Sequence, residues 1–173
     1  MSAPPTGVGG ATSSSSPSGQ GPRTSAAGMA TPPTLEVPAA ARAHTPAGAE
    51  AFVRYFNDVY TAALTKPDAT LLPMLCDTNS KSCAAFQKTA TELVIDGRRY
   101  RSAPLTLRSV TSVKGPSGDF EVLVGGQQNL VDIVDSNGTV ISTDPQRSFE
   151  FMYYPRWAGS TWVMHDVKLV SAA

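Results

Sequence analysis

The residues most able to do chemistry are the two cysteines, Cys76 and Cys83, in the stretch CDTNSKSC. Six residues separate them, whereas a thioredoxin-type redox couple needs two. A structural zinc site normally has four Cys or His ligands, and the only histidines are His44, before the first expected helix, and His165, in the last expected strand. A nucleophilic cysteine needs a nearby histidine or a basic environment, which nothing in the sequence suggests. The sequence therefore predicts no metal ion and no cofactor.

A disulfide between Cys76 and Cys83 fits the spacing better. Small exported domains commonly carry such a bridge, while the thiols of a cytosolic protein are kept reduced. Closing a ring of this size stabilises a fold by roughly 2–2.5 kcal/mol. The alternative is a pair of unpaired, buried cysteines. We predict the bridge, and with it a location outside the cytoplasm.

Acid–base catalysis would need a carboxylate, tyrosine or histidine that converges with a partner in a pocket. The candidates in this chain are Tyr55, Tyr60, Asp132, Tyr153, His165 and Asp166. Each also has a structural explanation, because a tyrosine can pack with its hydroxyl at the edge of a core, and the two aspartates alternate with apolar neighbours and should face solvent. No two of them have the spacing of a known motif, so no catalytic residue is assigned.

The charge distribution argues against nucleic acid as a partner. The formal net charge is zero and the acidic and basic residues are interspersed, whereas binding to phosphates requires an excess of Lys and Arg on one face. The exception is RRYR, with Arg98, Arg99 and Arg101 around Tyr100. This stretch is either a patch for phosphate or lipid headgroups or a solvated turn between two elements, and the turn is the favoured interpretation.

The first forty residues differ in composition from the rest of the chain. Residues 1–37 are dominated by Pro, Gly, Ser, Thr and Ala and contain no aromatic residue. Such a segment buries too little apolar surface to offset the entropy lost on ordering. We therefore expect a disordered tether over residues 1–40 and one domain over residues 41–173. No apolar run is long enough to span a bilayer, and the tether is typical of the region that follows a cleaved export signal.

Three helices are expected in the first part of the domain. Thr45 and Pro46 form a helix start, and apolar residues of helical period follow until Pro67 ends the helix at Lys66. Asp68 is placed to cap a short second helix that contains Leu71, Leu72, Met74 and Leu75. A third helix should begin near Ser80 or Ser82 and stop at Gly97.

From Ala103 onward the residues alternate as they do in strands. Gly125-Gly126 interrupts a long extended run and predicts a bulge or bend, and Asn137-Gly138 is a strong hairpin signal. We expect four to six antiparallel strands. The fold class is therefore α+β, with three N-terminal helices packed on one face of a curved antiparallel sheet.

A resemblance to a known family covers about residues 38–170. The stretch over residues 44–86, HTPAGAEAFVRYFNDVYTAALTKPDATLLPMLCDTNSKSCAAF, resembles the opening of an actinobacterial lipoprotein family of unknown function. LVDIVDSNGTV and the closing WVMHDV are also similar to that family. The resemblance implies a nuclear-transport-factor-2-like cone, the fold of ketosteroid isomerase and of SnoaL cyclases. It also implies a removed signal peptide and a lipid-bearing cysteine upstream, and hence anchorage of an extracytoplasmic domain to the cell membrane.

Two functions remain in view at this point. The first is a non-catalytic envelope module, displayed on the tether, that binds an unidentified protein or a small apolar ligand. The second is a small enzyme, of isomerase or hydrolase type, that uses the pocket of the cone for acid–base chemistry. Since one fold can serve either function, the residues that line the pocket must distinguish a binding module from an enzyme. A cavity of several hundred Å³ with two convergent polar groups would favour the enzyme.

Overall fold

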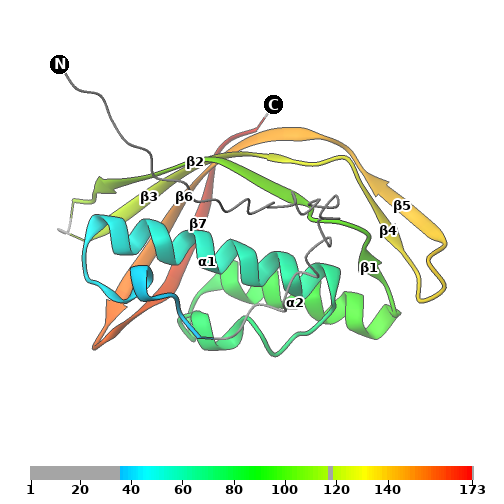
Figure 1. Ribbon diagram of the computed structural model, residues 1–173, viewed down its shortest axis with the longest axis horizontal. Helices are drawn as coiled ribbons and strands as arrows, with labels where there is room; N and C mark the ends of the chain where they lie inside the picture. The colour runs from blue at the N-terminus through cyan, green and yellow to red at the C-terminus, as the bar shows by residue number, and fades with distance from the viewer. Residues whose placement is uncertain (1–35, 117–118, 173) are drawn as a thin grey trace, which may run out of the picture. The chain divides into compact units, whose positions relative to one another are not determined.

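A computed structural model describes residues 36–116 and 119–172, all of which belong to one compact unit. Residues 1–35, and with them most of the predicted tether, lie outside the described residues. The described chain begins with a 3-10 helix, η1 (Ala39–Arg42), followed by α1 (Pro46–Thr65), a second 3-10 helix, η2 (Pro73–Leu75), and α2 (Lys81–Asp96). Strands make up the remainder, so the α+β class is confirmed (Figure 1).

Helix α1 forms as predicted and carries most of the apolar surface contributed by the helices. Thr45 Oγ1 accepts a hydrogen bond from the Gly48 amide at 3.1 Å, and Pro46 occupies the first helical position, where its missing N–H costs nothing. Phe52, Phe56 and other apolar residues of its inner face are almost completely buried. The helix therefore forms the centre of the core against which the sheet curves.

The second predicted helix is wrong. After Asp68 the chain makes turns, and only Pro73–Leu75 form one turn of 3-10 helix. The cause is Pro73, which lacks an N–H and would clash with the carbonyl group four residues earlier if an α-helix ran through it. Asp68 does accept hydrogen bonds from the amide and hydroxyl of Thr70, so it stabilises a local turn and not a helix. The described part of the chain thus has two α-helices where three were expected.

Helix α2 begins and ends where the sequence predicted. Ser80 Oγ accepts a hydrogen bond from the Cys83 amide at 3.1 Å, which caps the first turn. Gly97 closes the last turn with φ of 62°, a left-handed conformation that favours glycine. Only Cys83, Ala90 and Leu93 of this helix are buried, so α2 covers the core mainly with one narrow face.

The strands form two antiparallel sheets. The four-stranded sheet has the order β2 (Leu105–Lys114), β3 (Phe120–Gln128), β6 (Arg147–Ala158), β7 (Thr161–Ala172). The three-stranded sheet has the order β1 (Arg99–Tyr100), β4 (Val131–Val134), β5 (Val140–Asp144). These seven strands exceed the predicted four to six, because β1 is only two residues long and two long runs are each divided between the sheets.

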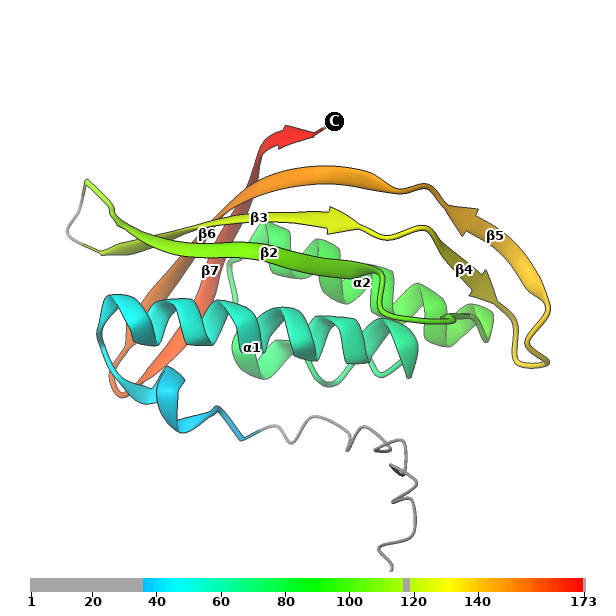
Figure 2. The same ribbon diagram turned by 45° about the horizontal axis from the view of Figure 1, so that its top comes forward.

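One long, bent hairpin connects the two sheets. Its tip lies between β4 and β5, where Gly138 has φ of 84°, so the predicted Asn-Gly hairpin is confirmed. Farther from the tip both sides of the hairpin break, at residues 129–130 and 145–146, and the pairing then continues between β3 and β6. Figure 2 shows the resulting curvature, with both sheets arching over the face that carries α1 and α2.

The glycine pair in β3 lies where the sheet is irregular, as the sequence predicted. The extra residue, however, is on the partner strand, because Arg108 has no partner between the Leu107–Gly126 and Ser109–Gly125 pairs. A Cβ on Gly126 would lie 2.6 Å from an atom of the Phe149 ring. The absence of a side chain at this position therefore lets the Phe149 ring approach β3 closely.

Candidate functional site

A cavity of about 280 Å³ lies between the two α-helices and the inner face of the four-stranded sheet. Its aromatic lining residues are Tyr60 of α1, Phe86 of α2, and Phe149, Phe151 and Tyr153 of β6. The aliphatic lining residues are Leu105, Val167, Leu169 and Ala172, and the polar ones are Gln128, Arg147 and Ser148. Most of the wall is thus apolar, as in pockets that bind small molecules, and the volume is near the lower end of their range of roughly 300–1,000 Å³.

The sequence of β6 arranges this lining along the cavity. Alternate residues of a strand point to the same face, so Phe149, Phe151 and Tyr153 all face the helices. Arg147, at the start of the strand, is exposed, whereas Tyr153 is only 3% exposed. The cavity therefore runs from a solvent-exposed polar end to a buried end.

Tyr153 closes the buried end with a short hydrogen-bond chain. Its hydroxyl donates to Asn57 Oδ1 at 2.9 Å, and Asn57 Nδ2 donates to the Val53 carbonyl at 2.8 Å. Asn57 is itself 4% exposed, so this chain satisfies polar groups that water cannot reach. Burial raises the pKa of Tyr153 to about 12, in spite of the hydrogen bond to Asn57.

Tyr60 is the second hydroxyl of the cavity. Burial raises the pKa of Tyr60 to about 12, although a hydrogen bond with the Thr89 side chain opposes the shift. Both tyrosines are therefore protonated near neutral pH and can donate a hydrogen bond, but neither is an effective base there. The cavity has two convergent polar groups, but the chemistry open to them is hydrogen bonding.

The other acid–base candidates do not reach this cavity. Tyr55 is buried in the core, and burial raises its pKa. Asp132 pairs with Arg101 at 2.8 Å and accepts a hydrogen bond from the Thr143 hydroxyl. His165 and Asp166 lie on β7 next to the disulfide. Of the six candidates, only Tyr60 and Tyr153 are brought together.

A second hollow, of about 300 Å³, lies between α1 and β2 and is more polar. Its lining includes Arg54, Asp58 and Thr61 of α1. Partial burial raises the pKa of the Asp58 carboxyl, and the attraction of Arg54 opposes the rise. Arg54 and Asp58 are four residues apart on the exposed face of one helix, where attraction between opposite charges is common, and we do not place the functional site here.

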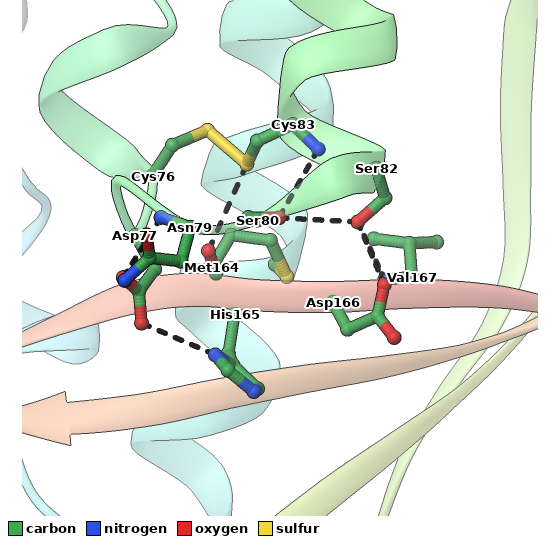
Figure 3. Close-up of a disulfide and its surroundings, with 10 residues drawn as sticks. All are labelled: Cys76, Asp77, Asn79, Ser80, Ser82, Cys83, Met164, His165, Asp166 and Val167. Atoms are coloured by element: carbon green, nitrogen blue, oxygen red, sulfur yellow. Dashed lines mark hydrogen bonds and ion pairs between the residues drawn. A yellow bond between two sulfur atoms is a disulfide. The ribbon is translucent and has the colours of Figure 1, made fainter.

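Cys76 and Cys83 are joined by a disulfide, with Cα atoms 6.0 Å apart, as the sequence predicted. The position of the disulfide ring (residues 76–83) was not predicted, because the ring covers the free edge of β7 (Figure 3). The Asp77 amide donates to the Met164 carbonyl at 2.9 Å, and the Val167 amide donates to Ser82 Oγ at 2.9 Å. An open strand edge offers unpaired N–H and C=O groups to other chains. The ring therefore satisfies part of this edge as well as linking η2 to α2.

Asp77 also links the disulfide ring to the β6–β7 hairpin through polar contacts with side chains of both strands. Its carboxylate lies 2.5 Å from the Arg156 guanidinium and 3.1 Å from His165 Nδ1. The hydrogen bond from His165 and a weaker one from the Asn79 amide hold the pKa of Asp77 below its usual range. This cluster explains His165 as a structural partner of the ring.

The three arginines of the RRYR stretch are exposed and the stretch connects α2 to β2, as the favoured interpretation has it, but it contains a short strand in place of a simple turn. Arg99 and Tyr100 form β1, and the Tyr100 hydroxyl donates to Asp144 at 2.8 Å. Arg98 pairs with Asp96 at 3.6 Å and Arg101 with Asp132. Two of the three arginines are therefore neutralised by neighbours, which leaves little charge for a phosphate patch.

The two histidines belong to different clusters. His44 stacks on Trp157 with ring centroids 5.0 Å apart, whereas His165 forms a hydrogen bond with Asp77.

Within residues 36–116 and 119–172, no three His, Cys, Asp or Glu side chains converge to form a metal site. In the same part of the chain, no helix is long and apolar enough to cross a bilayer.

Replacing Tyr153 by phenylalanine should lower the free energy of unfolding by about 1–3 kcal/mol, because Asn57 Oδ1 would lose its buried donor. Chemical denaturation followed by circular dichroism measures this change. Tyr154→Phe is the matched control. Tyr154 is the next residue of β6, and its ring faces the other side of the strand, where the Lys168 ammonium group lies over it. The control should change stability by less than about 0.5 kcal/mol. Equal effects of the two changes would contradict the role of the Tyr153–Asn57 bond.

Comparisons with known proteins support the fold. No family model and no curated protein matches the chain. The intermembrane space region of the chloroplast protein ARC6 is similar over 73% of this chain and 97% of its own, with 19% identity and a TM-score of 0.52. A designed protein whose name refers to nuclear transport factor 2 aligns over 68% of this chain and 95% of its own, with 17% identity and a TM-score of 0.40. The first likeness shows a shared fold; the second is too distant to support an inference.

Proposed function

We propose that this domain is a non-catalytic binding module whose cavity takes a small apolar ligand. The observation that carries the proposal is the wall of the cavity, in which five aromatic and four aliphatic residues surround about 280 Å³. Transfer of an apolar ligand from water to such a wall is favourable in proportion to the area buried. The α-helices and the sheet all contribute to this wall, so the fold as a whole forms the site.

Acid–base catalysis has less support, even though two tyrosine hydroxyls converge as an enzyme would require. An enzyme needs a group that exchanges protons near the working pH. No carboxylate or histidine is among the lining residues. The pKa of both Tyr60 and Tyr153 is raised to about 12, which removes them further from that range. The polar groups of the cavity are therefore suited to orient a ligand.

The proposed location and anchorage of this module rest on the sequence resemblance, with support from the fold and the disulfide. A long helix held in the concave face of a bent antiparallel sheet supports the nuclear-transport-factor-2-like cone. The disulfide supports a location outside the cytoplasm, where such bridges persist. We propose an extracytoplasmic lipoprotein domain, anchored to the membrane by lipid and displayed on a Ser/Gly/Pro-rich tether. Determination of the precursor sequence tests the anchor, because a signal segment that ends without a cysteine would contradict it.

Titration with N-phenyl-1-naphthylamine, a neutral apolar dye that fluoresces when it leaves water, tests the binding. We expect saturable binding to the wild-type protein and at least tenfold weaker binding to Val167→Trp, because the larger ring would fill the cavity. Ala172→Trp obstructs the cavity from the end of β7 and gives an independent second variant. Ile141→Trp is the control, since Ile141 is 47% exposed on β5 and does not line the cavity. Unchanged binding in both cavity variants would overturn the proposal.

A further inference from the structure

The polar residues of the cavity gather at one end. Gln128 ends β3 and lies directly opposite Arg147, which begins β6, and Ser148 follows on the same strand. From Arg147 to Tyr153 the strand advances about 20 Å, at roughly 3.3 Å per residue. The lining changes over this length from an exposed cation to buried aromatic rings. The cavity is therefore amphipathic along its axis.

Arg147 is the only charged residue among those that line the cavity. Four of the seven other arginines that the structure describes pair with a carboxylate, namely Arg42, Arg98, Arg101 and Arg156. Within the described part of the chain, no carboxylate lies within ion-pair distance of the Arg147 guanidinium. Among the described residues, the polar end of the cavity thus carries one positive charge that has no carboxylate partner.

A guanidinium group is well suited to bind an oxyanion. Its planar N–H donors match the two oxygens of a carboxylate, or two oxygens of a phosphate, in a bidentate arrangement. Gln128 lies directly opposite Arg147 on the neighbouring strand, and its side-chain amide can supply a further hydrogen bond. No lining residue carries a negative charge that would repel such a group.

We propose that the ligand is an amphipathic anion, with an oxyanion head group held by Arg147 and an apolar tail that extends along Phe149 and Phe151 toward Tyr153. This inference rests on the proposed function, because it specifies the chemistry of a ligand that occupies the same cavity. The exposure of Arg147 leaves the head group at the surface, while the tail is removed from water.

Three ligands with the same eight-carbon tail test the head group. Octanoate, octyl phosphate and octanol are used to displace N-phenyl-1-naphthylamine from the wild-type protein and from Arg147→Gln. We expect octanoate or octyl phosphate to bind at least tenfold more tightly than octanol to the wild type. Arg147→Gln should remove this preference and leave the affinity for octanol unchanged. The tighter of the two anions identifies the head group as a carboxylate or a phosphate.

Two further variants distinguish the charge and geometry of Arg147 from a general effect of removing an arginine. Arg147→Lys keeps the charge but loses the bidentate geometry, so it should retain part of the preference for anions. Arg99→Gln removes an exposed arginine of β1 that does not line the cavity, and it should change nothing. Equal affinity of the wild type for octanol and both anions, with the dye still bound, would overturn the head-group inference alone. Failure of the dye and of all three ligands to bind would overturn the proposed function with it.

Discussion

Replacing Trp162 by alanine is expected to lower the free energy of unfolding by about 3–5 kcal/mol, the largest loss that we predict for a single side chain. Trp162 is 2% exposed and is the largest of the fully buried side chains of the core. Its indole N–H also donates to the Ala43 carbonyl at 3.1 Å, which ties the segment before α1 to the β6–β7 hairpin. The variant would therefore create a cavity and release that segment.

Urea denaturation followed by circular dichroism measures the loss, with two comparison variants. Trp162→Phe keeps most of the apolar surface but removes the N–H donor, so it should fall between the wild type and the alanine variant. Trp157→Ala removes a half-buried ring that stacks on His44, and a smaller loss is expected. A loss of less than about 1 kcal/mol for Trp162→Ala would show that this end of the domain does not hold the fold together.

Replacing Cys76 or Cys83 by serine is expected to cost about 2–2.5 kcal/mol, because the unfolded chain would no longer be restrained by the ring. For a domain of this size the melting temperature should fall by roughly 5–10 °C. The wild-type protein should be two protons lighter than its fully reduced form, and neither sulfur should react with alkylating reagents. Two readily alkylated thiols in protein made under oxidising conditions would contradict the bridge.

The edge of β7 adds a second consequence to the loss of the disulfide. Hydrogen exchange at the amides of Asp77 and Val167 should become faster in either serine variant, because both amides form hydrogen bonds between the ring and β7. The effect should be larger at Asp77, since the Val167 amide also donates to Asp166 Oδ1. Cys83 Sγ lies 3.7 Å from the Met164 carbonyl, a packing contact, since a disulfide sulfur has no proton to donate. Ser82→Ala is the matched control, as it removes one of the two acceptors of the Val167 amide, the other being Asp166 Oδ1, and leaves the disulfide intact. It should speed exchange at Val167 and leave Asp77 protected.

The elements that the sequence predicted well are those with local causes. The start of α1 depends on Thr45 and Pro46, and the end of α2 depends on Gly97, so each boundary is determined by residues within one turn. The Asn137-Gly138 hairpin likewise needs only its own turn conformation. The second helix failed for an equally local reason, since Pro73 should have excluded it.

The candidate site was less accessible to sequence analysis, because its residues come from distant parts of the chain. Tyr60, Phe86, Arg147 and Val167 meet only after the long hairpin bends and the sheet curves over both helices. Tyr60 and Tyr153 are candidates by residue type alone, but nothing nearby in the sequence marks Arg147 as the charge at the open end of the cavity. A single arginine before an alternating strand is common, so the role of Arg147 depends on its lack of a carboxylate partner among the residues that the structure describes. The position of the disulfide ring on β7 could not be predicted for the same reason, since the ring and the strand are distant in sequence and meet only in the folded domain.

The most direct test of the binding proposal is to locate a bound apolar molecule. Isotope-filtered NMR of the labelled protein with N-phenyl-1-naphthylamine reports which side chains lie within about 5 Å of the dye. We predict nuclear Overhauser effects from the dye to the methyl groups of Leu105, Val167 and Leu169 and to the ring of Phe151. Effects confined to exposed methyl groups such as those of Val140 and Ile141, or none at all at saturating dye, would contradict a ligand-binding cavity between the helices and the sheet.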